Sequence, residues 1–103
     1  MFIVLCNCPP ATAPALARAL VEGRYAACVN IIPGVTSVYQ WEGEICEDGE
    51  TTLLIKTSEA RMHALREKLV ELHPYSVPEI IATPIDDAVS HAPYVQWVRE
   101  MTQ

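Results

Sequence analysis

Apolar and β-branched residues dominate the stretch between Cys28 and Thr57, which carries the strongest pattern in the chain. Its first half, Cys28 to Glu42, is rich in β-branched and aromatic residues, which favour strands. Its second half, Glu44 to Thr57, contains an apolar run close to its end. Gly43 and the Asp48-Gly49 pair are the turn candidates, because glycine adopts positive φ without a steric penalty. The pattern predicts a long β-hairpin.

The length of this hairpin predicts that the chain associates with other copies of itself. A strand of roughly 15 residues spans about 50 Å, whereas a domain of this size is roughly 33 Å across. We expect a bend at Pro33-Gly34, because a bulge there removes a ladder donor. Val35, Tyr39 and Trp41 share one face, and an exposed aromatic face beside unpaired strand edges favours pairing with another chain. The alternative is a short hairpin whose aromatic residues lie in an intramolecular core.

Shorter apolar patterns on both sides of the hairpin predict the remaining elements. A nearly uniform apolar run is typical of a central strand, and apolar residues at three- and four-residue spacing are typical of helices. These patterns predict strands at Phe2–Asn7 and Glu79–Thr83 and helices at Thr12–Glu22 and Glu59–Leu72. The order predicts an α+β fold: a ferredoxin-like βαββαβ sandwich, with an antiparallel sheet, two helices on one face and an extra C-terminal helix.

Residues at the helix ends predict where each helix begins and stops. Thr12, Ser58 and Ser90 are candidate N-caps, and Gly23 is the predicted stop of the first helix. The apolar edge of the C-terminal helix comprises Tyr94, Trp97, Val98 and Met101. Such an edge suits either packing on its own sheet or an interface with another subunit.

Charge and composition restrict the partners. The chain of 103 residues has seven basic and thirteen acidic residues, a net charge of −6. This balance opposes binding to nucleic acid or anionic membranes, which depends on Lys and Arg. We expect one domain, residues 1–103, without direct membrane insertion, because the apolar run before Asn7 is short and lacks a basic leader. Four cysteines without a disulfide framework predict reduced thiols and a cytoplasmic protein.

Few side chains have the chemistry of a metal site. Cys6 and Cys8 lie two residues apart on a predicted strand and share a face, so both thiols could hold one soft cation. The alternative is a pair of small buried hydrophobic residues. His73, at the end of the second predicted helix, is a candidate metal ligand or acid–base group, or a simple partner of the helix dipole. Glu79 could ligate a metal or accept hydrogen bonds from a loop.

Other polar patterns carry less information. Glu47, Asp48 and Glu50 form an acidic cluster near the predicted hairpin tip, without the spacing of a calcium loop. The motifs GxSxG, HExxH and GxGxxG do not occur. Cys6 and His73 could form a nucleophile–base pair, but no pattern supplies a third group that orients them. We expect a binding protein and not an enzyme.

Several runs resemble the CutA family of divalent-cation tolerance proteins. They are Ala26–Tyr39, Trp41–Gly43, Leu54–Thr57, His73–Tyr75 followed by Val77–Ile81, and Tyr94–Val98. The match extends over nearly the whole chain, in order and with compatible spacing. The resemblance implies a ferredoxin-like subunit in a homotrimer, in which hairpin strands pair between subunits and the C-terminal helix helps to lock the assembly.

The resemblance also implies a function in tolerance to divalent cations, chiefly Cu(II), with Cys6 and His73 as metal ligands. Some members carry two adjacent histidines before the proline, whereas this chain has Leu72-His73, so one ligand is missing and Cys8 could replace it. The family brings no established catalytic activity. Because its trimer resembles that of PII signalling proteins, the alternative is a sensor or adaptor. Such a protein would bind a small anion or a protein between subunits, with Lys56 and Tyr75 lining the cleft.

Overall fold

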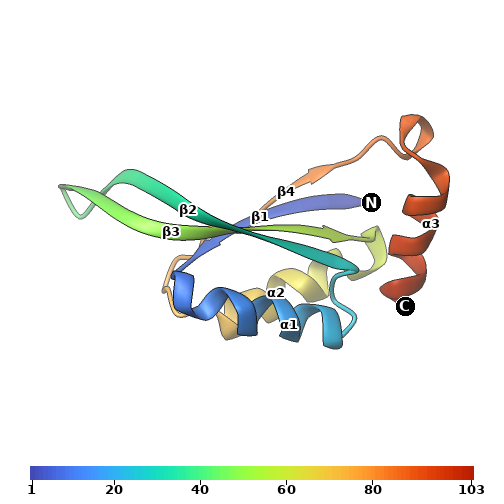
Figure 1. The fold of residues 1–103 in the computed structure, drawn as a ribbon, viewed down its shortest axis with the longest axis horizontal. Helices are drawn as coiled ribbons and strands as arrows, with labels where there is room; N and C mark the ends of the chain where they lie inside the picture. The colour runs from blue at the N-terminus through green and yellow to red at the C-terminus, as the bar shows by residue number, and fades with distance from the viewer.

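A four-stranded antiparallel sheet, with two helices against one face and a third at one end, forms the computed structural model, which describes residues 1–103 (Figure 1). The strands are β1 (Phe2–Cys8), β2 (Cys28–Trp41), β3 (Glu44–Thr57) and β4 (Ile81–Pro84). The α-helices are α1 (Ala13–Glu22), α2 (Met62–Leu72) and α3 (Ala92–Met101). Short 3-10 turns lie at Pro10–Thr12, Glu59–Arg61 and Asp87–Val89. The strand order β2-β3-β1-β4 is the ferredoxin-like arrangement, so the predicted fold class is confirmed.

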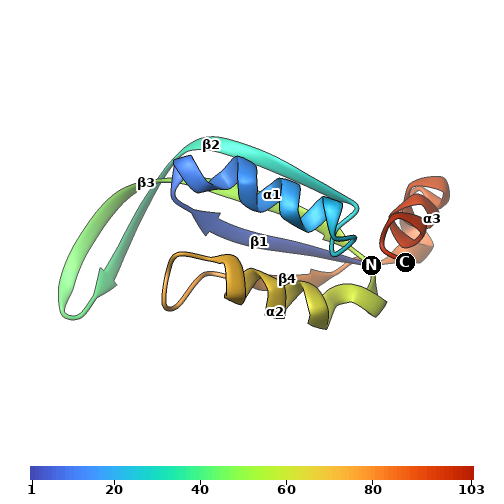
Figure 2. The ribbon, with the colours of Figure 1, turned by 90° about the horizontal axis from the view of Figure 1, so that it is seen from below.

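The hairpin of β2 and β3 is the longest feature of the molecule. Each strand has 14 residues, and the molecule measures 45 Å along its longest axis. The pairing shifts between Ile32 and Val35, where Gly34 has a φ of 76°, so the predicted bend is confirmed. Figure 2 shows the hairpin curving away beyond the helices. The structure therefore leaves the outer half of the hairpin uncovered by its own chain.

The hairpin turn is formed by Glu42 and Gly43. Their φ values of 50° and 79° match a two-residue turn in which both central residues need positive φ. The second predicted turn, at Asp48-Gly49, is wrong, because both residues lie inside β3 opposite Ser37 and Thr36.

The main core lies between the sheet and helices α1 and α2. Alternate residues of β1 point into it, and its largest fully buried members are Val4, Cys6, Cys8, Leu20, Leu53, Ile55, Leu65 and Leu69. The residues between them on β1, such as Leu5 and Asn7, are only half-buried. The first strand is thus central, as predicted, although only one of its faces is fully covered.

Thr12 and Ser58 stand at the N-cap positions of α1 and of the 3-10 turn before α2, as predicted, whereas the N-cap of α3 is His91 and not Ser90. None of the three hydroxyl groups caps a helix, because each has another partner. Thr12 Oγ1 donates to the carbonyl of Pro9 at 2.9 Å, and Ser90 Oγ donates to the carbonyl of Asp86 at 2.8 Å. The hydroxyl of Ser58 pairs with that of Thr102 at 2.7 Å. Helix α1 ends at Glu22 as predicted.

Helix α3 packs at one end of the sheet through a second, smaller core. Val95 and Val98 are its buried residues, and Arg99 pairs with Asp87 at 2.6 Å. Of the predicted apolar edge, Val98 is buried in this core, whereas Tyr94, Trp97 and Met101 are between 37% and 40% exposed, so its own chain covers the edge only in part. This helix presents a second apolar face that its own chain does not cover. None of the helices is long and apolar enough to cross a membrane.

Candidate functional site

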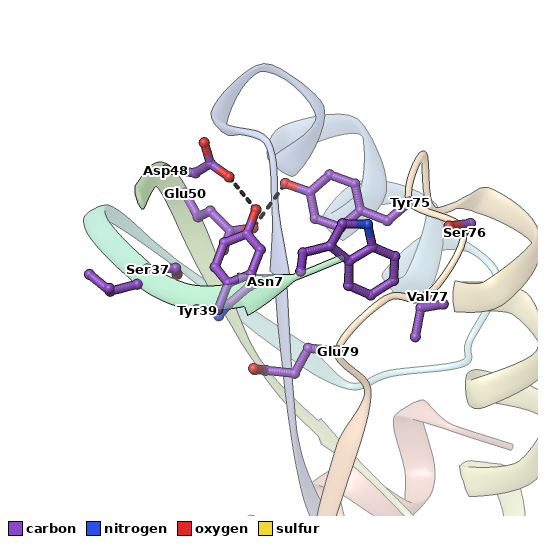
Figure 3. Close-up of a pocket in the computed structure, with 11 residues that line it drawn as sticks. Asn7, Ser37, Tyr39, Asp48, Glu50, Tyr75, Ser76, Val77 and Glu79 are labelled. Carbon is purple, nitrogen blue, oxygen red and sulfur yellow. Dashed lines mark hydrogen bonds between the residues drawn. The ribbon is translucent and has the colours of Figure 1, made fainter. Parts of the chain in front are cut away.

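A cavity of about 590 Å³ lies between the bent hairpin and the loop that follows α2 (Figure 3). Alternate side chains of a strand share a face, so β2 and β3 each bring a row of residues to the cavity. Asn7 lines it from the end of β1. The lining residues are Asn7, Ser37, Val38, Tyr39, Trp41, Asp48, Glu50, Tyr75, Ser76, Val77 and Glu79. None of these residues carries a positive charge, whereas Asp48, Glu50 and Glu79 are acidic.

Two hydrogen bonds between a phenol and a carboxylate lie in the wall of the cavity. Tyr39 donates to Asp48 Oδ2, and Tyr75 donates to Glu50 Oε2 at 2.9 Å (Figure 3). The hydrogen bond to Asp48 raises the pKa of Tyr39 to about 12. Burial, together with the bond to Glu50, raises the pKa of Tyr75 above its usual value. Both phenols therefore stay protonated at neutral pH and hold the carboxylates in place.

His73 lies next to this cavity and is only 7% exposed. Its Nδ1 accepts the backbone N–H of Tyr75 at 3.1 Å, and its Nε2 lies 2.8 Å from the carbonyl oxygen of Asn7. Because a carbonyl oxygen can only accept, Nε2 carries the proton and the imidazole is neutral. The two partners fix the tautomer of the ring and position the Tyr75 loop.

Cys6 and Cys8 are completely buried on the core face of β1. Cys6 Sγ approaches the carbonyl oxygen of Asn7 at 3.9 Å, and Cys8 Sγ approaches that of Thr51 at 3.8 Å. Burial raises the pKa of the Cys6 thiol to about 12 and raises that of Cys8 in the same direction. Both thiols are therefore protonated at neutral pH.

The predicted metal ligands come together only in part. Cys6 and His73 both approach the carbonyl oxygen of Asn7, whereas Cys8 turns to Thr51. Glu79 lines the cavity. No three side chains among the His, Cys, Asp and Glu residues of one chain gather into a metal-ligand group.

Sequence reasoning missed part of this cavity. Glu50 was grouped with the hairpin tip, yet it is 8% exposed and is the first residue of the buried half of β3. The available signal was the apolar run that begins three residues later at Leu53. Lys56 contacts Asn30 Oδ1 and Cys28 Sγ and Tyr75 lines the cavity of the single chain, but the predicted cleft between subunits that both residues would line stays a prediction.

Comparison with known proteins decides the family. The model of the CutA1 divalent ion tolerance protein family matches residues 2–101. This chain belongs to the CutA1 family. The divalent-cation tolerance protein CutA of Thermus thermophilus is 53% identical over 87 residues, which are 84% of this chain and 82% of that protein. Human protein CutA is 46% identical over 94% of this chain, but this match spans only 54% of the human protein.

A solved CutA structure has the same fold. The PII-like protein CutA from Nostoc, in apo form, superposes with a TM-score of 0.96 and is 40% identical, covering 100% of this chain and 98% of that chain. The recognised resemblance to CutA is therefore confirmed, together with the ferredoxin-like subunit that it implied.

Proposed function

We propose that this CutA1 family member is a cytoplasmic homotrimer that binds Cu(II) or another divalent cation and contributes to metal tolerance without catalytic activity. Residues 1–103 act as one domain in this proposal. Family membership and the name of the Thermus relative support the tolerance function. The observation that carries the metal site is the convergence of Cys6 and His73 on one carbonyl oxygen, that of Asn7.

The donor atoms of Cys6 and His73 suit the proposed cation. Thiolate and imidazole groups bind copper and zinc in preference to hard cations. Metal binding requires Cys6 to lose a proton and one ring nitrogen of His73 to exchange its present partner, Tyr75 N–H at Nδ1 or the carbonyl of Asn7 at Nε2, for the metal. We therefore expect copper binding to release protons and to strengthen as the pH rises. Cys8 or Glu79 would have to move to complete the ligand set within one subunit.

The exposed apolar residues support the trimer. On the hairpin they include Ile31, Ile32, Val38, Tyr39, Trp41 and Ile45, and on α3 they include Tyr94 and Trp97. A strand edge with exposed apolar side chains is a surface on which another chain pairs. In the proposed trimer, neighbouring subunits cover the outer half of the hairpin and the outer face of α3.

Copper titration of the metal-free protein tests this function. The double variant Cys6→Ser, His73→Ala should lose at least about tenfold in affinity, because ligand removal removes direct metal bonds. The control is Cys46→Ser, His63→Ala, which changes a cysteine and a histidine outside the proposed site. Unchanged affinity in the first variant would remove Cys6 and His73 from the metal site.

A second candidate function is a PII-like trimeric sensor without a dedicated metal site. The cavity beside the hairpin and the likeness to the PII-like Nostoc protein support it. The carboxylates on the cavity wall oppose an anion as its ligand there. Thermal stabilisation in metal-free buffer tests this candidate, because a ligand at 100 times its dissociation constant adds about 2.7 kcal/mol.

A further inference from the structure

The base of the hairpin carries a thiol and an amine at directly opposite positions of its two strands. Cys28 is the first residue of β2, and its register partner on β3 is Lys56. Register partners in an antiparallel pair point to the same face of the sheet, so the two strands hold these side chains together. Lys56 Nζ lies 3.7 Å from Cys28 Sγ, and both residues are half-buried. A nitrogen and a sulfur nucleophile are therefore in contact.

Lys56 has no carboxylate partner that would hold its amine away from the thiol. It is the only basic residue in the four strands, and its ammonium group forms no ion pair within the chain. Its two hydrogen-bond partners, Cys28 Sγ and Asn30 Oδ1, are both on β2. The nitrogen can therefore reach the sulfur of Cys28 and, after losing one proton, offer it a lone pair.

The chain offers Cys28 no second thiol. Cys6 and Cys8 are buried on the face of the sheet that α1 and α2 cover, whereas Cys28 and Lys56 point to the opposite face. Cys46 lies in the outer half of the hairpin, and all four cysteines are free. An oxidised Cys28 therefore has the Lys56 amine beside it, and no thiol of its own chain with which to form a disulfide.

We propose that Cys28 and Lys56 form a reversible, peroxide-dependent cross-link between β2 and β3. Hydrogen peroxide takes two electrons from the sulfur, which becomes a sulfenic acid, and one water molecule is released. The Lys56 amine, having lost its proton, attacks this sulfur, and the hydroxyl group leaves as a second water molecule. The S–N bond that forms is a sulfenamide, the product that sulfenic acids also give with backbone nitrogen. A thiol reductant returns the free thiol and the free amine.

The surroundings of the pair favour this reaction over competing ones. Tyr94 of α3 also lies near Cys28, but burial and the neighbouring thiol raise the pKa of this phenol, so it stays protonated at neutral pH and is a weak nucleophile. Both reacting residues are at the base of the hairpin, whereas neighbouring subunits in the proposed trimer cover its outer half. The cross-link would tie the two strands together at this base and remove the positive charge of Lys56. It is independent of the metal site proposed at Cys6 and His73.

Peptide mass spectrometry tests the proposal on the assembled protein, treated with hydrogen peroxide in EDTA and then unfolded and digested without reductant. Cleavage after glutamate places Cys28 in residues 23–42 and Lys56 in residues 51–59. We expect these two peptides to stay joined, with their combined mass lower by two hydrogen atoms, and to separate when a thiol reductant is added. Trypsin should no longer cleave after the modified Lys56, so that residues 25–61 remain one peptide.

Two variants should lose the joined peptides. Lys56→Arg keeps the positive charge but removes the amine, and Cys28→Ser removes the thiol; should one of them fail to fold, the other still decides. Cys46→Ser is the matched control, because Cys46 is also half-buried on the hairpin but lies far from Lys56, and it should form the cross-link like the parent protein. Absence of the joined peptides from the parent protein, or equal amounts of them in Lys56→Arg, would overturn the proposal.

Discussion

His73 Nε2 donates a hydrogen bond to the carbonyl oxygen of Asn7 at 2.8 Å, and this bond joins the end of α2 to the end of β1. Asn7 stands between the two buried cysteines, and His73 precedes the loop that forms one side of the cavity. A single imidazole therefore connects the core strand, the helix and the cavity wall. Its role in stability can be measured separately from any role in metal binding.

The first prediction concerns this imidazole. His73→Ala removes the bond to Asn7, the acceptor for Tyr75 N–H and a buried ring, so the free energy of unfolding should fall by about 2–3 kcal/mol. Urea denaturation without metal measures it. His63→Ala, at an exposed position on α2, should change the free energy of unfolding by less than about 0.5 kcal/mol. Equal effects of the two substitutions would show that the bond to Asn7 is unimportant.

The bend in the hairpin gives a second prediction. Gly34 has a φ of 76°, which an L-residue adopts at a cost, so Gly34→Ala should destabilise the protein by about 1 kcal/mol. Gly49→Ala is the control, because Gly49 has no positive φ and a Cβ there meets no atom within 4 Å. It should be neutral or slightly stabilising. Thermal unfolding of both variants measures the difference, and a larger loss in Gly49→Ala would contradict the structure of the bulge.

The buried thiol of Cys6 predicts how stability depends on alkaline pH. Burial raises its pKa from 9.0 to about 12 in the folded protein. Between these two pH values the unfolded chain loses the thiol proton and the folded chain keeps it. The unfolded state then binds fewer protons, so the free energy of unfolding decreases as the pH rises. The stabilisation is complete below pH 9 and is lost progressively towards pH 12.

Denaturation curves between pH 8 and pH 11 check this sign. Cys6→Ala should lower stability at neutral pH, because it removes a buried group, but should flatten the alkaline decline. Cys46→Ala, outside the main core, should keep the decline of the parent protein. An unchanged decline in Cys6→Ala would mean that other groups cause it.

The attachment of α3 gives a fourth prediction. The hydroxyl of Thr102 is buried and lies 2.7 Å from Ser58 Oγ and 2.8 Å from the carbonyl of Val98. Thr102→Val keeps the shape but leaves Ser58 without its partner, so it should cost about 1–2 kcal/mol. Thr36→Val, on the exposed part of β2, serves as the control and should change stability by less than about 0.5 kcal/mol. Hydrogen exchange should be faster at the α3 amides in Thr102→Val than in the parent protein, which would show that this helix loosens.

The sequence predicted the elements well where periodicity was long, and poorly where one residue had several possible partners. The bend at Pro33-Gly34 followed from strand length and glycine chemistry. The hydroxyl of Ser58 was assigned to a helix start, because the sequence does not reveal that Thr102 lies beside it. The Asp48-Gly49 turn was wrong because the pairing of β3 with β2 overrides a local preference.

The candidate site shows the same limit. The motif resemblance identified Cys6 and His73, and the structure brings both to the carbonyl of Asn7. The cavity carboxylate Glu50 was missed, because its burial depends on the loop that carries Tyr75, a contact between residues 25 positions apart in the chain. Local pattern gives the type of element, whereas the partners of polar groups depend on distant segments.

Native mass spectrometry after exposure of the chelator-free protein to Cu(II) tests the central claim most directly, since it reports subunit number and bound metal together. The account predicts a trimer that retains copper in the parent protein, and a trimer without copper in the Cys6→Ser, His73→Ala variant. A folded monomer, or a trimer whose copper content is the same in both proteins, would contradict it.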